Sequence, residues 1–390
     1  MEFEAEDGED SYIWFHCASL GEFEQGRPVM EKMKKLYPEK YILLTFFSPS
    51  GYENKKGYKG ADYIFYLPID TAANAKRFLD IWKPELAVFV KYEFWFNYID
   101  ELYKRNIPIV FISSIFRKGQ HFFRFYGSWF RKQLRKVTYF FVQNKESVIY
   151  LNNIGVRNAI VSGDTRFDRV FEIKTNPRTF KDVESFIQGS IIFIAGSTWN
   201  KDHEVLLPLV NKSYKGIKYI IVPHEIDKNS IENLEKRING KSVKLSDEDK
   251  SAYPEAQVLI VDSVGMLSQL YQYASVAYIG GGFGKGVHNI LEAAVFGMPV
   301  FFGPNYNKFQ EARELIKYGG AFSIKSDNEL INHTYRILSN YNILKETSEI
   351  SKEYVSLKKG ATDKIITYLQ AMVNNSKELV AKMHKEINLN

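Results

Sequence analysis

Short apolar runs alternate with amphipathic helical patterns along almost the whole chain, and this rhythm limits the fold more than any other feature. It is typical of βαβ units, in which helices cover both faces of a parallel sheet. In the first half we expect strands at residues 13–16, 41–45, 63–66, 86–90, 109–113, 139–142 and 159–161. In the second half we expect them at residues 191–195, 219–222, 258–261, 276–279 and 300–302. Helices are expected between them, including residues 26–37, 201–211, 263–273, 289–296 and 309–318.

The chain of 390 residues is long enough for two or three domains. The rhythm breaks at residues 171–189, which are polar and contain Pro177. We therefore predict an N-terminal Rossmann-like domain (1–170), a linker (171–189), a C-terminal Rossmann-like domain (190–350) and a C-terminal helical segment (351–390). The predicted fold class is α/β, with two doubly wound domains facing a central cleft. Ligands of such sheets bind at the carboxyl ends of the strands.

Composition excludes several classes of protein. With 45% apolar and 25% charged residues the chain is neither disordered nor fibrous. No apolar run approaches the ~18 residues that span a bilayer. The acidic start MEFEAEDGED is unlike a signal peptide. The single cysteine, Cys17, excludes an intramolecular disulfide and a cysteine metal cluster, and it fits a reducing cytosol.

Two glutamates follow predicted strands of the first half. Glu22 comes after residues 13–16 and is a candidate general base, although Ser19 and Glu22 also have the spacing of a helix-capping box. Glu93 lies in the segment KYEFW after residues 86–90, where aromatic neighbours would desolvate it and raise its pKa. The alternative for Glu93 is an exposed carboxylate whose aromatic neighbours face the core.

A third charged segment, GDTRFD, follows the predicted strand at residues 159–161. Its Arg166 is a candidate phosphate-binding residue, because a guanidinium forms charge-assisted hydrogen bonds with phosphate oxygens. The alternative is a surface ion pair with Asp164 or Asp168.

A glycine-rich segment in the second half is the strongest single indication of a ligand site. Residues 280–286 contain five glycines, and a helix is expected to begin near Asn289. Backbone N–H groups in such a loop bind phosphate without a metal, and Glu292 is placed to accept hydrogen bonds from ribose hydroxyls. The spacing matches neither the dinucleotide-binding nor the P-loop pattern. A purely structural glycine turn is the alternative.

Three other predicted strands of the second half end in polar or glycine-containing segments. The residues are Ser197 and Thr198, then Pro223 and His224, then Gly265, Met266 and Leu267. Together with the glycine-rich segment they predict an anion and nucleotide site at one edge of the sheet. The segment Asp247-Glu248-Asp249 has a D-x-D metal pattern but no strand before it, so we interpret it as solvated surface and predict no metal site.

Residues 116–137 combine basic and aromatic side chains and contain no acid. A helix at residues 123–137 would place Phe123, Phe130, Leu134 and Val137 on one side, with Arg124, Arg131 and Arg135 flanking them. That arrangement suits an acceptor-side helix facing a membrane. The alternative is that the apolar side chains pack on the domain core. No nucleic-acid-binding motif accompanies the segment, so no nucleic acid partner is expected.

Four segments together resemble the Kdo transferases, bacterial enzymes that transfer 3-deoxy-D-manno-oct-2-ulosonic acid (Kdo) in lipopolysaccharide synthesis. They are WFHCASLGEFEQGRPV at residues 14–29, KYEFW at 91–95, GDTRFDRV at 163–170 and GGGFGKGVHNILEAAVFGMPVFFGPNYNKFQEA at 280–312. Any one of them is a weak signal, but the four in this order are specific.

The resemblance implies an inverting GT-B glycosyltransferase that needs neither metal nor cofactor, with CMP-Kdo as donor and a lipid A precursor (lipid IVA) as acceptor. Glu22 matches the family's general base, and Glu93 and Arg166 match positions that stabilise the transition state. The matches to CMP contacts are Pro223, His224, Gly265, Met266, Leu267, Asn289, Ile290, Leu291 and Glu292. The resemblance also implies a location at the cytoplasmic face of the bacterial inner membrane.

This chain departs from the family pattern in three places. The usual tripeptide P-R-H is Pro223-His224 without the arginine, and the usual G-E-L is Gly265-Met266-Leu267. The family's apolar N-terminal anchor is expected to be absent, because the first predicted strand begins about a dozen residues from Met1. Two rivals remain: another GT-B nucleotide-sugar enzyme, such as a different glycosyltransferase or a sugar epimerase, and a non-catalytic protein that binds membrane surfaces.

Overall fold

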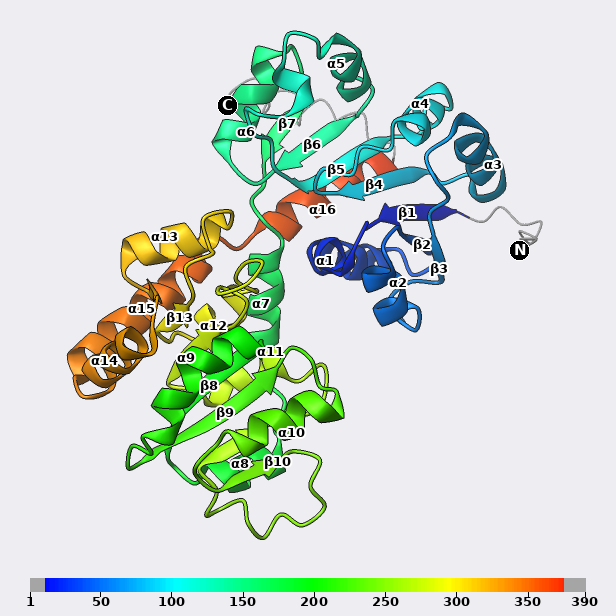
Figure 1. Ribbon diagram of the computed structural model, residues 1–390. Helices are drawn as coiled ribbons and strands as arrows, with labels where there is room; N and C mark the ends of the chain where they lie inside the picture. Colours follow the sequence, from blue (N-terminus) through cyan, green and yellow to red (C-terminus); the bar gives the residue numbers. More distant parts are fainter. Residues whose placement is uncertain (1–10, 375–390) are drawn as a thin grey trace. The chain divides into compact units, whose positions relative to one another are not determined.

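The computed structural model describes residues 11–374, which form two compact α/β units (Figure 1). The first unit contains the described residues up to Arg169 and those from Lys358 onward, and the second is Val170–Leu357. Each unit contains one seven-stranded sheet with parallel pairing. The prediction of two doubly wound α/β domains is therefore confirmed. The amino-terminal segment on which the expectation of a missing anchor depends lies outside the described residues.

The first sheet has the strand order β3-β2-β1-β4-β5-β6-β7. Its strands are β1 (Tyr12–His16), β2 (Tyr41–Phe46), β3 (Tyr63–Tyr66), β4 (Leu86–Val90), β5 (Ile109–Ser114), β6 (Tyr139–Val142) and β7 (Ala159–Val161). Its helices are α1 (Leu20–Leu36), α2 (Pro49–Lys55), α3 (Ala72–Trp82), α4 (Phe96–Lys104), η1 (His121–Phe123), α5 (Ser128–Leu134), α6 (Lys145–Asn153) and α16 (Ala361–Val373). Helix α7 (Arg166–Thr175) contains the boundary between the units.

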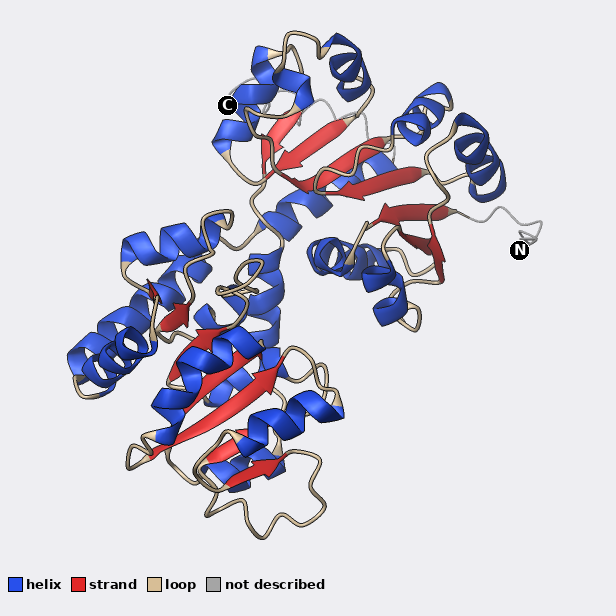
Figure 2. Cartoon of the chain, viewed as in Figure 1, coloured by secondary structure: helices blue, strands red, loops and turns tan. Residues whose placement is uncertain are grey.

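Helices cover both faces of this sheet (Figure 2). Successive strand residues point to opposite faces, so Trp14 packs with α3 and α4 while Ile13 and Phe15 pack with α1 and α16. Burial on both faces explains why the strands are continuous apolar runs that a sequence pattern detects.

The second sheet has the order β10-β11-β9-β8-β12-β13-β14. Its strands are β8 (Ile191–Thr198), β9 (Ile217–Pro223), β10 (Ser242–Lys244), β11 (Val258–Ile260), β12 (Val276–Ile279), β13 (Val300–Phe302) and β14 (Ala321–Ser323). Its helices are α8 (Lys181–Ile187), α9 (Asn200–Asn211), α10 (Lys228–Lys236), α11 (Leu267–Leu270), η2 (Tyr271–Tyr273), α12 (Leu291–Ala294), α13 (Gln310–Tyr318), α14 (Asp327–Leu338) and α15 (Tyr341–Leu357). Within residues 11–374, no helix is both long and apolar enough to cross a membrane.

Two expectations about the domain boundaries are corrected. The segment at residues 171–189 is no extended linker, because it contains most of α7 and all of α8. The C-terminal segment from residue 351 is neither one helix nor a separate unit: α15 ends at Leu357, and α16 belongs to the first unit. Asp168 accepts hydrogen bonds from the backbone N–H groups of Gly360 and Thr362 and so fixes the start of α16.

Candidate functional site

Charged residues of the first unit gather where the strand order reverses. Strand β1 pairs with β2 on one side and with β4 on the other. Glu22 follows β1, and Lys91 and Glu93 follow β4, so all three lie at the carboxyl ends of the two strands that flank the reversal. This is the position at which open α/β sheets bind their ligands.

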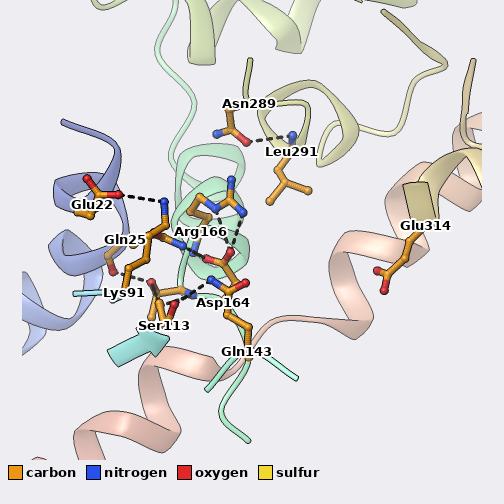
Figure 3. Close-up of polar contacts among 12 residues, drawn as sticks. Glu22, Gln25, Lys91, Ser113, Gln143, Asp164, Arg166, Asn289, Leu291 and Glu314 are labelled. Carbon is orange, nitrogen blue, oxygen red and sulfur yellow. Dashed lines mark hydrogen bonds and ion pairs between the residues drawn. The ribbon is translucent and has the colours of Figure 1, made fainter. Parts of the chain in front are cut away.

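Glu22 is held by two side chains, of which Figure 3 shows Lys91. The Ser19 hydroxyl donates to one carboxylate oxygen, and Lys91 Nζ lies 3.1 Å from the other. Ser19 is the N-cap residue of α1 but forms no side-chain cap hydrogen bond, so the capping-box alternative is wrong. Burial alone would raise the pKa of Glu22, but the charge and hydrogen bond of Lys91 and the hydrogen bond of Ser19 lower it overall. Glu22 is therefore ionised at neutral pH.

Glu93 has the opposite electrostatic environment. Burial raises its pKa, and the negative charge of Glu22 raises it further, while Trp95 and Lys91 oppose the change. Two carboxyl groups whose pKa values are displaced in opposite directions are an arrangement suited to proton transfer.

Lys91 has a left-handed backbone with φ = 65°, which is uncommon for a residue with a side chain. The Ser114 hydroxyl donates to its carbonyl oxygen over 2.5 Å and holds this conformation. Backbone strain of this kind occurs at many binding and active sites, so Lys91 is a candidate for such a role. The sequence motif contains Lys91, but its ion pair with Glu22 joins residues 69 positions apart and was not predicted.

Arg166 forms a two-point contact with Asp164 (Figure 3). Its Nε and Nη2 donate to Asp164 Oδ2 over 3.0 and 2.7 Å. Gln25 of α1 donates to Asp164 Oδ1 over 3.0 Å. Burial would raise the pKa of Asp164, but Arg166 lowers it overall. The ion pair of Arg166 with Asp164, which the sequence analysis gave as the alternative, is therefore formed. Because Asp164 is buried, it is not a surface ion pair.

The loops of the second unit that the sequence singled out share one edge of its sheet. Strands β11, β9, β8 and β12 are neighbours in that order. The carboxyl ends of these strands and the segments after them contain Gly265–Leu267, Pro223–His224, Ser197–Thr198 and residues 280–292, respectively. A Cβ at Gly280 would collide with the carbonyl oxygen of Ser197, so glycine permits the end of β8 and the loop after β12 to touch.

A buried carboxylate that the sequence did not indicate joins these two loops. Asp202 Oδ2 accepts hydrogen bonds from the backbone N–H groups of Trp199 and Gly281, each over 2.9 Å. Its Oδ1 accepts one from the Tyr278 hydroxyl over 2.7 Å. Asp202 is 1% exposed and lies 79 residues from Gly281. It therefore fixes the glycine-rich segment relative to the loop after β8.

Three aromatic side chains form a stack at the same edge. Trp199 Nε1 donates to His288 Nε2 over 2.9 Å, and the two rings are only 10° from parallel. His224 stacks on both, with ring centroids 4.3 Å from Trp199 and 4.7 Å from His288. Because an indole N–H only donates, neutral His288 carries its proton on Nδ1. Burial and His224 lower the pKa of His288 to about 4, so the stack is uncharged at neutral pH.

The residues predicted to contact the nucleotide after β12 lie at the start of a short helix rather than of a long one. Helix α12 begins at Leu291 and ends at Ala294, shorter than expected. Asn289 accepts the backbone N–H of Leu291 over 3.2 Å and donates to Glu292 Oε1 over 3.0 Å, which orients the Glu292 carboxylate. Ile290 and Leu291 are buried beneath them. The helix expected at residues 263–273 is likewise reduced to α11 and η2.

The aspartates of the D-x-D segment stabilise a turn through hydrogen bonds with nearby backbone N–H groups. Asp247 accepts the backbone N–H of Lys244 over 2.7 Å, and Asp249 accepts that of Ser251 over 2.8 Å. In the part of the chain that the structure describes, no three His, Cys, Asp or Glu side chains converge as metal ligands would.

The predicted acceptor-side helix at residues 123–137 is not formed. The chain makes η1, a turn and then α5. Leu134 and Val137 are core residues, and Phe123 and Phe130 pack against the same core, so the apolar residues do not face outward. Arg131 donates to the carbonyl oxygens of Phe122 and Arg124, and Arg135 donates to that of Ile154. Of the three arginines proposed to face a membrane, only Arg124 is both exposed and without a side-chain hydrogen bond to residues 11–374.

Residues 2–169 match the family described as 3-deoxy-D-manno-octulosonic-acid transferase (kdotransferase). The 3-deoxy-D-manno-octulosonic acid transferase of Aquifex aeolicus is 28% identical over 367 residues, which cover 92% of this chain and 94% of that protein. The enzyme of the same name from Haemophilus influenzae is 25% identical, covering 92% of this chain and 86% of its own length. A bifunctional glycosyltransferase/methyltransferase of Fusobacterium nucleatum is 28% identical over 88% of this chain, which spans only 55% of that longer protein.

Solved structures share the fold. A UDP-GlcNAc 2-epimerase from Neisseria meningitidis, bound to UDP-GlcNAc, has a TM-score of 0.61 at 14% identity and covers 92% of this chain and 99% of its own. The MurG protein of Acinetobacter baumannii has a TM-score of 0.56 at 14% identity, with the same coverage of 92% and 99%. At these identities the likeness shows the fold alone, which is of the GT-B type.

Proposed function

We propose, because residues 2–169 belong to the 3-deoxy-D-manno-octulosonic-acid transferase family, that this glycosyltransferase moves Kdo from CMP-Kdo to a lipid A precursor, lipid IVA. The transfer is direct, inverting and independent of metal. The observation that carries the proposal is Glu22, an ionised carboxylate fixed by Ser19 and Lys91 where the strand order of the first sheet reverses.

In this mechanism Glu22 takes the proton of the acceptor sugar hydroxyl, which attacks the anomeric carbon of Kdo as CMP leaves. Its lowered pKa keeps it in the proton-accepting form at neutral pH. Glu93 and Arg166 stabilise the transition state. The contact with Asp164 fixes the plane of the Arg166 guanidinium, and a fixed donor costs no reorganisation when charge develops.

The second unit holds the CMP part of the donor. Backbone N–H groups of the loops after β8 and β12, with the hydroxyls of Ser197 and Thr198, suit the phosphate. Glu292, oriented by Asn289, suits the ribose hydroxyls. Pro223, His224, Gly265, Met266 and Leu267 complete this edge, and Ile290 and Leu291 support it from below. The ring of Trp199 covers one face of His224, next to the position where the family's arginine is missing.

The test is incubation with CMP-Kdo and a tetraacylated lipid A precursor, followed by mass spectrometry of the lipid. We expect a mass increase of one or more Kdo residues, unchanged by EDTA. A lipid of unchanged mass would refute the transfer, and activity that EDTA abolishes and magnesium restores would refute metal independence.

A second candidate is a sugar epimerase or another glycosyltransferase of the same fold, which the fold-level likeness to a UDP-GlcNAc 2-epimerase favours. Ligand-induced stabilisation separates the two. CMP should raise the melting temperature and UDP should not, because only a ligand that binds the folded state stabilises it. Stabilisation by UDP alone would favour the second candidate.

A further inference from the structure

The second unit contains a cavity at the end of its sheet opposite to the candidate nucleotide site. Its volume is ≈ 210 Å³. Ile191 and Ile217, which line it, are the first residues of β8 and β9, whereas the residues that we assign to the nucleotide lie at or beyond the carboxyl ends of these strands. The other lining residues come from the loop between α9 and β9 and from the end of α14, and they are Tyr214, Lys215, Thr334, Tyr335, Leu338 and Ser339.

Thr334 contributes a buried hydroxyl that lacks a partner. The residue is 2% exposed, and its Oγ1 forms no hydrogen bond with residues 11–374. A buried hydroxyl without a hydrogen bond destabilises the folded state, and native proteins contain few such groups. Threonine in a helix adopts either of two χ1 rotamers, so rotation about one bond can turn the hydroxyl toward a ligand. A polar atom of a ligand in the cavity would supply the missing partner.

The walls of the cavity are apolar and aromatic. The rings of Tyr214 and Tyr335 have centroids 6.5 Å apart and planes tilted by 36°. Tyr335 is 64% exposed and Ile191 is 40% exposed, so apolar surface is left for a ligand to cover. An engineered cavity of about 150 Å³ in a protein core binds benzene. A cavity of ≈ 210 Å³ therefore has room for one aromatic ring with a small substituent.

The loop that presents Tyr214 is fixed by hydrogen bonds. The hydroxyl of Ser213 donates to Gln257 Oε1 over 2.9 Å, and the backbone N–H of Ile217 donates to the carbonyl oxygen of Tyr214 over 3.1 Å. A site that is formed before its ligand arrives loses little conformational entropy on binding. The aromatic wall is therefore available without rearrangement of the loop.

Charge is limited to the rim of the cavity. Among the described residues that line it, Lys215 alone is charged, and its side chain is exposed. A charged ligand would have to leave water and face Ile191, Ile217 and Leu338, which is costly. A water molecule is also a poor occupant, because a buried water needs two to four polar partners. The lining therefore favours an uncharged ligand.

We propose that this cavity binds a small uncharged aromatic molecule that has one hydrogen-bonding substituent. The ring lies against Tyr214 and Tyr335, where aromatic pairs are favourable, and the substituent pairs with the Thr334 hydroxyl. The site is distinct from the nucleotide site and goes beyond the proposed Kdo transfer.

The experiment is a fluorine NMR titration of the full chain with para-fluorophenol and para-fluorotoluene, which have nearly the same size and differ in one hydroxyl. The wild-type protein should bind para-fluorophenol more tightly. Thr334→Val replaces the hydroxyl by a methyl group and should weaken para-fluorophenol roughly 2- to 10-fold, the worth of one hydrogen bond, while para-fluorotoluene binds as before. Tyr335→Ala should weaken both probes, because it removes part of the aromatic wall.

Thr362→Val and Tyr318→Ala are the matched controls. Thr362 of α16 also has a buried hydroxyl without a partner among residues 11–374, Tyr318 of α13 is 57% exposed, and neither lines the cavity. Both variants should bind the probes as wild type does. Thr334→Val should also have a raised melting temperature without ligand, because it removes an unsatisfied buried hydroxyl, and this measurement reports that the variant is folded.

Equal affinities of the two probes for the wild-type protein would overturn the proposal, as would equal losses of both in Thr334→Val or unchanged binding by Tyr335→Ala. Tighter binding of para-fluorobenzoate than of para-fluorophenol would refute an uncharged ligand. Saturating CMP should leave the probes bound, since the two sites lie at opposite ends of β8 and β9, and displacement by CMP would refute a separate site. Failure of the Kdo transfer assay would leave these results standing.

Discussion

The carboxyl edges of the two sheets are built from different chemistry on nearly the same topology. At the edge of the first sheet, charges lie in contact: Glu22 with Lys91, and Asp164 with Arg166. At the edge of the second, the groups are backbone N–H donors, hydroxyls and a neutral ring stack. The buried carboxylate of Asp202 there accepts hydrogen bonds that hold the loops together.

This difference shows that the fold decides where a ligand binds and the side chains decide what happens to it. Paired charges displace pKa values, which suits the removal of a proton from an acceptor. Neutral donors suit an anionic phosphate, and the carboxylate of Glu292 at the same edge suits ribose hydroxyls, so this edge suits a nucleotide. Experiments that alter one edge should therefore leave the property of the other unchanged.

The largest effect is expected from the charged edge. Glu22→Gln should lower turnover by roughly 10²-fold or more, because it removes the group that accepts the proton. CMP affinity should be unchanged, since that property belongs to the other edge. The control is Glu24→Gln on the same helix, which removes only a contact with Lys55. Turnover near the wild-type value in Glu22→Gln would contradict the assignment.

At the carboxyl edge of the second sheet, the largest effect is expected from Asp202→Ala. This change leaves two backbone N–H groups and the Tyr278 hydroxyl buried without an acceptor, at a cost of about 2–4 kcal/mol in the free energy of unfolding. Urea unfolding measures it, and CMP affinity should fall as well. Asp202→Asn, which keeps an oxygen for the N–H groups, should recover most of the loss. Equal stabilities of Asp202→Ala and the exposed control Glu248→Gln would show that the carboxylate is dispensable.

A smaller effect is expected from Lys91→Met, on the pH dependence of kcat/KM. Lys91 lowers the pKa of Glu22, so the base remains ionised as the pH falls. Lys91→Met removes that influence, the pKa of Glu22 rises, and the acidic limb of kcat/KM against pH moves to higher pH. Lys91→Arg keeps the charge and should keep the limb in place. A purely structural role of Lys91 would lower activity equally at every pH.

The smallest effect is expected from Trp199→Phe. Phenylalanine retains the stack but donates no hydrogen bond to His288 Nε2, so the pKa of His288 should rise from about 4. An NMR titration of the histidine rings measures it. His203, whose pKa burial also lowers to about 4, contacts Thr198 instead and serves as the control in the same spectra. A His288 titration that does not move would mean that Trp199 does not fix its proton.

The sequence predicted all seven strands of the first sheet but missed the two edge strands of the second. Strands buried on both faces, such as β4 and β12, are unbroken apolar runs that match their predicted bounds. Strands β10 and β14 lie at the two edges of the second sheet and are only partly buried, so they lack the apolar run that made the equally short β7 and β13 recognisable. Helix α1 begins six residues earlier than expected, since Gly26 and Pro28 within it disfavour a helix.

The sequence predicted which loops form the candidate site but not which side chains in them contact one another. Each loop that we singled out follows a strand, and strand ends can be read from local pattern. The pairs Glu22–Lys91 and Trp199–His288 join residues 69 and 89 positions apart, and no local pattern encodes them. The helix predicted at residues 123–137 failed for another reason: Phe123, Phe130, Leu134 and Val137 do form an apolar pattern, but they pack in the core of the first unit.

The return of α16 to the first unit has a consequence for how the chain is made. Ile365 and Leu369 complete the core that Ile13, Phe15 and Val88 begin. A ribosome delivers those three residues early but releases the helix that covers them only after the whole second unit has emerged. The nascent first sheet must therefore wait with one face incompletely covered, exposed to chaperones and to aggregation, until α16 has emerged.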